Sequence, residues 1–203
     1  MMRHYEEAKK AFLERFEKFE MIIEKDDGVF RHLRFRDPKE MHGWFNITTA
    51  PDMLVVRGDY GTYVFSRVYD MFNFFRGTGG TDPGYVASKA IAQPVEGARA
   101  CSVFDQRKLK EQVAEAFGYY LDYEHYDKSE EVKEDYTEEL YDFLDELDSW
   151  EALYEADGTE MCDSGFMFRC YDFSPEVLSY SYLWSYFAVV YGIERYFKNV
   201  EKQ

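Results

Sequence analysis

Three short runs of β-branched and aromatic residues stand out between residues 44 and 67, and two turn signals separate them. The runs are Trp44–Thr49, Met53–Arg57 and Thr62–Arg67, with Ala50-Pro51-Asp52 and Gly58-Asp59-Tyr60-Gly61 between them. Residues of the first kind pack well on a pleated, half-buried surface, and Gly and Asp supply the backbone conformations of tight hairpins. The pattern predicts an antiparallel meander of three strands.

A fourth strand is predicted just before the meander. Along Phe30–Arg36, Leu33 and Phe35 fall on one face. Arg34 and Arg36 fall on the opposite face. Such alternation is typical of a strand with one face in the core and the other in water. Paired with the meander, this strand gives a four-stranded antiparallel sheet over residues 30–67.

Helical spacing is found on both sides of the sheet. Apolar residues recur every three or four positions from Tyr5 to Ile23, which predicts a helix of about five turns that Gly28 caps. After the sheet, the spacing predicts further helices. These are Tyr69–Arg76, Tyr85–Gln93, Lys108–Tyr123 with Asp105 as N-cap, and Val177–Asn199 after a start at Ser174-Pro175.

The last of these helices is apolar nearly all round until Glu194, so we expect it in the core. Its serines and tyrosines argue against a membrane span. A strand is predicted at Phe166–Tyr171. With 46% hydrophobic and 19% aromatic residues, the 203-residue chain can bury a substantial core. The prediction is one α+β domain over residues 1–203, with a predominantly helical C-terminal two thirds.

The negative charge is concentrated in one region. The chain carries a net charge of −16, and residues 120–160 hold seventeen Asp and Glu against two Lys, a net of −15. Within this region Tyr136, Leu140, Phe143, Leu144, Leu147 and Tyr154 keep a helical apolar stripe. We therefore expect the acidic region to be a folded helix with a charged face.

An acidic chain disfavours direct binding to nucleic acid and to anionic membranes, and it favours a basic partner. The carboxylates expected to bind that partner lie off the apolar stripe. They are Glu130, Glu131, Glu134, Asp135, Glu138, Glu139, Asp142, Asp145, Glu146 and Asp148. The competing interpretation is that this face is only solvated.

The other chemistry-bearing residues form no recognisable site. Cys101, Cys162 and Cys170 lack metal-type spacing and the four histidines are scattered, so we expect free thiols, no metal and no cofactor. Gly77–Gly84 lacks the lysine and the strand-to-helix context of a phosphate-binding loop. No nucleophile elbow is present, which favours a binding protein over an enzyme. Met1–Lys10 has no apolar core, so a cytoplasmic location is expected.

Charged residues at the ends of the meander strands allow two interpretations. Asp59 can accept hydrogen bonds from the backbone of its turn, and Arg67 can pair with Asp70. Alternatively, a pocket over the sheet binds a small ligand or a substrate. Its lining would be Arg34, Arg57, Asp59 and Arg67.

Two stretches carry a family resemblance. Residues 44–76 contain WFxIT, GDYGTYVFSR and DMFxFFR, and Leu183-Trp184 and Tyr191-Gly192-Ile193 follow near the C-terminus. These motifs resemble small proteins encoded by tailed phages and prophages. The resemblance implies no catalytic residues. By analogy it implies an accessory phage protein that inhibits host defence.

Charge and resemblance together lead to three hypotheses. The first is a phage counter-defence protein of the anti-CRISPR or anti-restriction type. Acting as a DNA mimic, it would occupy a basic, nucleic-acid-binding surface of a host protein or ribonucleoprotein complex. The second is a small-ligand-binding protein or enzyme that uses the pocket over the sheet. The third is a structural or regulatory phage protein.

Overall fold

The computed structural model describes residues 2–77, 82–94, 100–161 and 164–201. Two compact units are formed. Unit 1 consists of Met1–Val103 and Leu178–Gln203, and unit 2 consists of Phe104–Val177. The α+β class is confirmed. The single domain stays a prediction, because compactness does not show whether the two units unfold together.

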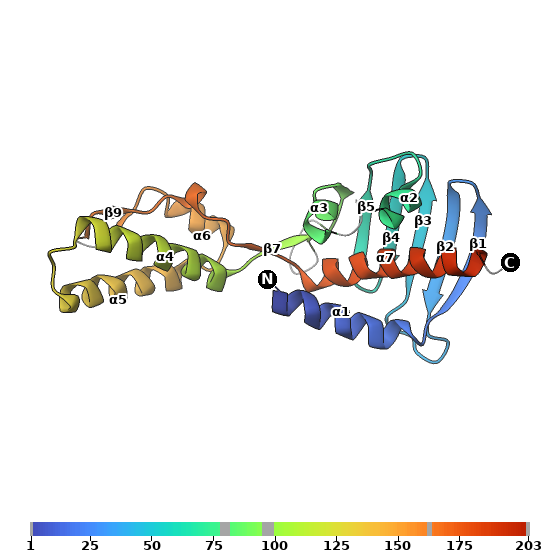
Figure 1. Ribbon diagram of the computed structural model, residues 1–203, viewed down its shortest axis with the longest axis horizontal. Helices are drawn as coiled ribbons and strands as arrows, with labels where there is room; N and C mark the ends of the chain where they lie inside the picture. Colours follow the sequence, from blue (N-terminus) through green and yellow to red (C-terminus); the bar gives the residue numbers. More distant parts are fainter. Residues whose placement is uncertain (1, 78–81, 95–99, 162–163, 202–203) are drawn as a thin grey trace. The chain divides into compact units, whose positions relative to one another are not determined.

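Unit 1 is built on a six-stranded antiparallel sheet whose strands follow chain order (Figure 1). The strands are β1 Glu20–Asp27, β2 Phe30–Arg36, β3 Phe45–Ala50, β4 Met53–Gly58, β5 Gly61–Phe65 and β6 Ala90–Ala92. The predicted strands are confirmed as β2 to β5. The predicted four-stranded sheet was too small, because β1 and β6 extend it at its two edges.

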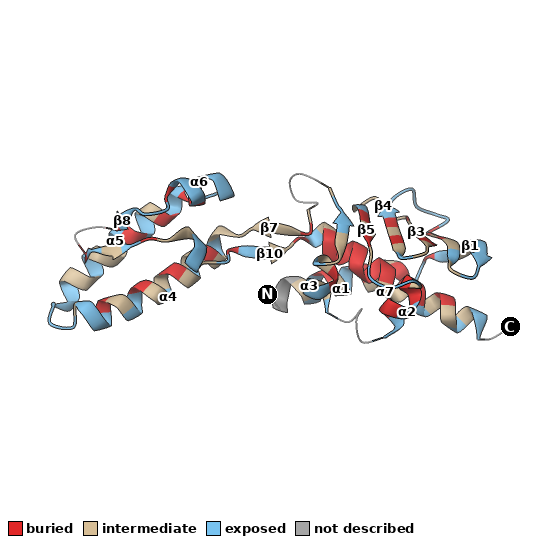
Figure 2. Cartoon of the chain, turned by 90° about the horizontal axis from the view of Figure 1, so that it is seen from above, coloured by how far each residue is buried: buried red, intermediate tan, exposed pale blue. Residues whose placement is uncertain are grey.

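The helices of unit 1 pack on one face of this sheet. They are α1 Met2–Phe16, α2 Met71–Arg76, α3 Pro83–Ala87 and α7 Tyr180–Val200. α7 is buried along most of its length, as Figure 2 shows, and the inward residues of the strands pack against it. Gly192 permits this close approach, since a Cβ there would lie 2.8 Å from Ile47 Cδ1. The buried helix predicted near the C-terminus is therefore confirmed.

β1 replaces the end of the predicted N-terminal helix, which stops at Phe16. Phe19 and Ile23 are four residues apart, and this spacing suits the inward face of a strand as well as a helix. Arg195 of α7 donates hydrogen bonds to the carbonyl oxygens of Phe16 (2.8 Å) and Phe19 (2.6 Å). Gly28 is not a helix cap, because with a φ of 59° it lies in the turn between β1 and β2.

Other element boundaries also differ from the predictions. The segment expected to be helical over Tyr85–Gln93 continues as a helix only to Ala87 and then pairs as β6. α7 begins after Ser179, whose hydroxyl accepts a hydrogen bond from the Tyr182 N–H, and not at Ser174-Pro175. The intervening residues form β10, Glu176–Leu178, which pairs with β7, Ser102–Phe104.

Unit 2 is mainly helical. Its elements are α4 Gln106–Glu124, α5 Glu130–Glu146, α6 Trp150–Glu155 and the hairpin of β8 Glu160–Met161 with β9 Phe166–Met167. A 3₁₀ turn, Cys170–Asp172, takes the place of the second half of the predicted strand. Asp105 caps α4, as predicted.

The apolar stripes of α4 and α5 form the core of unit 2. Leu109, Val113 and Phe117 of α4 are buried together with Leu140 and Leu144 of α5. The predicted stripe of the acidic helix is therefore confirmed at its centre. Tyr154, which we placed on that stripe, is instead exposed, because it follows the turn into α6.

Buried acidic protons in unit 1 predict a loss of stability at high pH. Burial raises the pKa of the Cys101 thiol to about 12 and also raises the pKa of the Tyr182 and Tyr186 phenols. The unfolded chain releases these protons at its ordinary pKa values of about 8.5 and 10, whereas the folded chain keeps them. The contribution of these groups to the free energy of unfolding is therefore fully present below about pH 8.5. Above that pH the free energy of unfolding falls, by up to about 1.4 kcal/mol per pH unit for each of these buried thiol and phenol groups.

Urea unfolding followed by circular dichroism at several pH values between about 8 and 11 measures this loss. Cys101→Ala removes the thiol and should make the stability curve shallower between about pH 9 and 10. A free energy of unfolding that stays constant across the range would contradict the prediction.

Cys101 and Cys170 are free thiols, as predicted, and Cys162 lies outside the described residues.

Candidate functional site

The two units differ sharply in charge. Unit 2 carries six Lys and Arg against 23 Asp and Glu, a net charge of −17 with neutral histidine. Unit 1 carries 18 Lys and Arg against 17 Asp and Glu, a net charge of +1. The acidity of the chain is therefore a property of unit 2 alone.

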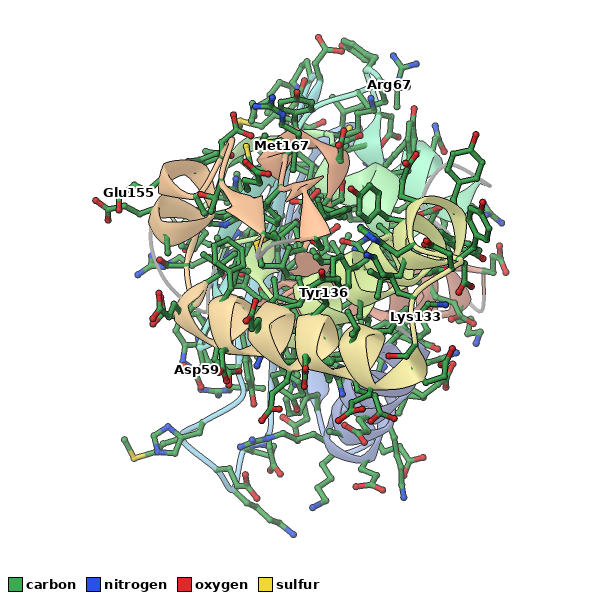
Figure 3. All side chains as sticks on the ribbon, turned by 90° about the vertical axis from the view of Figure 1, so that its left-hand side faces the viewer. Asp59, Arg67, Lys133, Tyr136, Glu155 and Met167 are labelled. Carbon is green, nitrogen blue, oxygen red and sulfur yellow. The ribbon has the colours of Figure 1, made fainter. Side chains whose placement is uncertain are left out.

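The ten predicted partner-binding carboxylates are all exposed, and nine of them lie on α5. We refer to these ten as the acidic surface. Figure 3 looks onto α5, where Lys133 and Tyr136 are labelled among the projecting side chains. Asp148, the tenth member, follows the end of the helix. The structure thus places nine of the ten on one helix and the tenth just after it, although placement alone does not test their role.

The charge pattern of α5 is unfavourable for the helix itself. Glu130 and Glu131 suit the first turn, which also has Ser129 as its N-cap. Asp145 and Glu146 lie in the last turn, where the helix dipole disfavours negative charge. Acids repeat at i and i+4 along its length, and each such like-charged pair is destabilising by about 0.2–0.5 kcal/mol.

Few cations neutralise the acidic surface. Lys133 lies 3.6 Å from Glu130, and Lys110 pairs with Asp145. In the part of the chain that the structure describes, the other eight members form no ion pair. The carboxylates therefore remain available to an external cation.

Exposed tyrosines lie close to these charges in the sequence. Tyr119, Tyr123 and Tyr126, at and just after the end of α4, are 70%, 80% and 78% exposed. Tyr141 of α5 is also exposed. Phenol rings provide contact area and stack on guanidinium groups, which suits a partner rich in arginine.

Of the four residues predicted to line a pocket over the sheet, Arg34 and Arg57 lie on one face as the cross-strand neighbours of Asn46, and the other two lie apart from each other. Asp59 precedes β5 and Arg67 follows it, so the two lie at opposite ends of that strand (Figure 3). Of the predicted four, only Arg34 lines a hollow on the sheet, and Arg57 is exposed outside it. Asp59 accepts a hydrogen bond from the backbone N–H of Gly43, which belongs to another loop and not to the turn of Asp59 that we predicted.

The predicted pair between Arg67 and Asp70 was wrong. Asp70 accepts hydrogen bonds from both terminal nitrogens of Arg31, at 2.9 and 3.1 Å, and also caps α2. Arg67 Nε instead donates to the Tyr85 hydroxyl, 3.3 Å away. The half-buried Arg31 reaches Asp70 from β2, a contact between distant parts of the chain that local spacing does not reveal.

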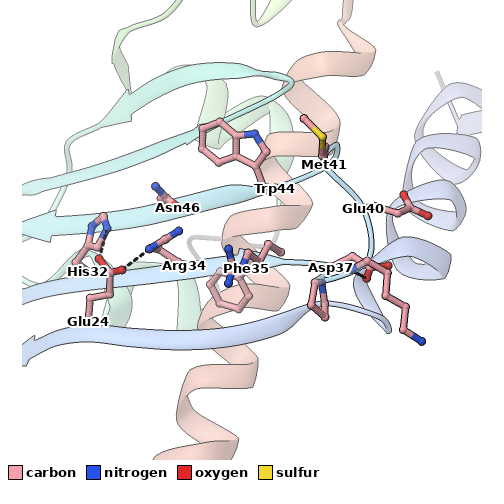
Figure 4. Close-up of a pocket in the computed structure, with 12 residues that line it drawn as sticks. Glu24, His32, Arg34, Phe35, Asp37, Glu40, Met41, Trp44 and Asn46 are labelled. Atoms are coloured by element: carbon pink, nitrogen blue, oxygen red, sulfur yellow. Dashed lines mark hydrogen bonds and ion pairs between the residues drawn. The ribbon is translucent and has the colours of Figure 1, made fainter.

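The hollow lies beside β2 and β3, and Figure 4 shows its lining side chains. Arg34 donates a hydrogen bond to Glu24 (2.6 Å), which lowers the pKa of that carboxyl group. His32 Nε2 lies 3.2 Å from the other Glu24 oxygen, and His32 Nδ1 lies 2.7 Å from Thr48 Oγ1. These contacts hold the polar side chains in place on the sheet.

Of this lining only Arg34 was predicted, and the residues not predicted include Glu24 and Trp44. Glu24 fell inside the predicted helix and in fact lies at an irregularity of β1. Trp44 precedes β3 by one residue, so the alternation of the strand would have placed it on the face of Asn46. That alternation was the one signal in the sequence that could have placed Trp44 in the lining.

The described ranges contain no cluster of three or more His, Cys, Asp or Glu side chains placed to hold a metal ion. None of the helices in those ranges is both long and apolar enough to cross a bilayer.

Gly77–Gly84, considered above for phosphate binding, includes residues 78–81, which lie outside the described residues. No protein-family model, curated protein or solved structure matches the chain.

Proposed function

We propose that the protein binds the basic, nucleic-acid-binding surface of a host protein or ribonucleoprotein complex through the acidic surface of unit 2. In this proposal it is a phage counter-defence protein of the anti-CRISPR or anti-restriction type. The supporting observation is that eight exposed carboxylates of one helical region form no ion pair within the described residues. The counter-defence context rests on the phage-like motifs of residues 44–76.

The spacing of the charges supports a DNA-mimicking mode of binding. The 17 residues of α5 carry nine carboxylates. At a rise of about 1.5 Å per residue, this is about one negative charge per 2.8 Å of helix axis. A single DNA strand carries one phosphate per about 3.4 Å. A surface that binds a DNA backbone would therefore find a similar charge density on a rigid helix.

The energetic cost of the pattern also favours a binding role. Acids in the last turn and repeated like charges weaken α5, and lysine at several of these exposed positions would relieve both effects. A merely solvated face has no need of such a concentration. An external basic surface would offset the repulsion and steer association.

Capture from a nuclease-treated bacterial lysate tests the proposal. Immobilised protein should retain basic nucleic-acid-binding proteins. An excess of short duplex DNA should release them, because the duplex and the acidic surface compete for the same basic surface of the retained protein. Retained proteins that are not basic, or that stay bound in excess duplex, would contradict the proposed mode. Raised plating efficiency of a targeted phage in a host that expresses the protein would then establish the counter-defence role.

A further inference from the structure

The sheet face of unit 1 that carries none of the unit's helices contains a hollow of about 700 Å³ (Figure 4). Residues of β2 and β3 form its floor, and loop residues 37–41 form one side. Sites for small molecules typically measure about 300–1,000 Å³. The hollow therefore has room for a ligand of moderate size, and it is independent of the acidic surface.

The three carboxylates in the lining are already occupied. Glu24 accepts a hydrogen bond from Arg34 (2.6 Å), and Glu40 accepts one from Arg15 (2.9 Å). Asp37 accepts one from the backbone N–H two residues later (2.8 Å). Two of the three carboxylates are thus paired with an arginine, and the third accepts a hydrogen bond from its own loop.

Two cations in the lining remain without a partner. Neither Arg36 nor Lys39 forms an ion pair or a side-chain hydrogen bond with any residue that the structure describes. A guanidinium and an ammonium group in one hollow attract an anion, and the planar guanidinium fits a phosphate or a carboxylate with two hydrogen bonds. These two unpaired cations therefore provide a place for a small anion to bind.

Trp44 adds an apolar plane beside these cations. It directly precedes Phe45, which pairs with Phe35, the residue before Arg36, so the tryptophan and Arg36 are neighbours across the two strands. The indole is half-buried and stacks on no other ring among the residues described. Two positions along the same strand, Asn46 presents an amide into the hollow. A flat ring can stack on the indole while the amide binds its polar edge.

We propose that this hollow binds a mononucleotide, with the phosphate on Arg36 and Lys39 and the base on Trp44. An inorganic anion would leave the indole and the Asn46 amide unused. A longer nucleic acid strand would need more than two free cations for its phosphates. The hollow therefore fits one nucleotide better than a strand.

The indole N–H signals of Trp44, Trp150 and Trp184 in a two-dimensional NMR spectrum allow a direct test with the full chain. Titration with AMP, GMP, CMP and UMP should shift the Trp44 signal for at least one nucleotide. Adenosine, ribose 5-phosphate and inorganic phosphate should each bind at least about tenfold more weakly, because each lacks one half of the recognised structure.

Arg36→Ala should weaken nucleotide binding by about tenfold or more, as expected for the loss of a charged hydrogen bond. The matched control is Lys10→Ala, which removes an exposed cation of α1 that does not line the hollow, and it should change the affinity less than about twofold. The proposal is overturned if no mononucleotide shifts the Trp44 signal at millimolar concentration. It is also overturned if both variants lose affinity equally, if ribose 5-phosphate binds as tightly as the nucleotide, or if a ten-nucleotide single strand binds more tightly.

Discussion

Replacing Trp184 with alanine is expected to lower the free energy of unfolding by about 3–5 kcal/mol. The side chain projects from α7, is 1% exposed and packs against α1 and the sheet. Its ring meets Phe12 edge-on with centroids 5.0 Å apart and stacks on Tyr60 at 4.3 Å. Because these neighbours belong to different elements, the structure cannot easily collapse into the space that alanine leaves.

Urea unfolding followed by circular dichroism measures this loss without depending on tryptophan fluorescence. Trp150→Ala is the matched control, since Trp150 is 37% exposed on α6 of unit 2. We expect the control to be less destabilised than Trp184→Ala, because surface substitutions have small effects. An unchanged unfolding midpoint for Trp184→Ala would show that α7 is not the centre of the core.

The central strands were predictable because each one combined alternation with a turn signal at its end. In Phe30–Arg36 the predicted faces are observed for residues 33–36, whereas Arg31 lies on the face of Leu33 and Phe35 and pairs with Asp70. The edge strands lacked such signals. Near β1, Ile23 lies four residues after Phe19, and this spacing fits the period of a helix as well as that of a strand. At the other edge, β6 is only three residues long.

The start of α7 was ambiguous for a similar reason. Both Ser174 and Ser179 can cap a helix, and Pro175 favoured the first of them. The structure selects Ser179, because residues 176–178 pair with β7 before the helix begins. Pairing between distant segments decided the boundary, and no local pattern could have revealed it.

The two candidate sites differ in how far the sequence could predict them. The acidic surface is a local feature of α5 and the residues just after it, so composition and spacing were enough to predict that its ten carboxylates are exposed. The hollow is assembled from three strands and a loop, so only Arg34 was anticipated. The contact of Glu24 with Arg34 depends on the pairing register of β1. This strand was not predicted, because a helix was expected over its residues.

Reversing four charges on α5 is expected to have the largest effect on binding. The variant carries Lys in place of Glu131, Glu134, Glu138 and Asp142, none of which forms an ion pair within the described residues. Association with the proposed basic partner should slow by about tenfold or more at low salt, because steering by opposite fields is lost. The fold should be retained or slightly stabilised, since all four side chains are exposed and their mutual repulsion is reduced.

A second fourfold reversal provides the control for net charge. It places Lys at Glu6, Glu14, Glu17 and Glu20 of unit 1, which are exposed and lie outside the acidic surface. Both variants change the charge of the chain by the same amount. A difference between them therefore reports the location of the charges and not their sum.

The most direct measurement uses wild-type protein and these two variants as baits in the same nuclease-treated lysate, with the retained proteins quantified by mass spectrometry. Melting curves of the three proteins establish beforehand that each is folded. We predict that wild-type protein and the unit 1 variant retain the same basic nucleic-acid-binding proteins, and that the α5 variant loses them. Equal retention by a stably folded α5 variant would contradict the proposal and reduce the acidic surface to a solvated face.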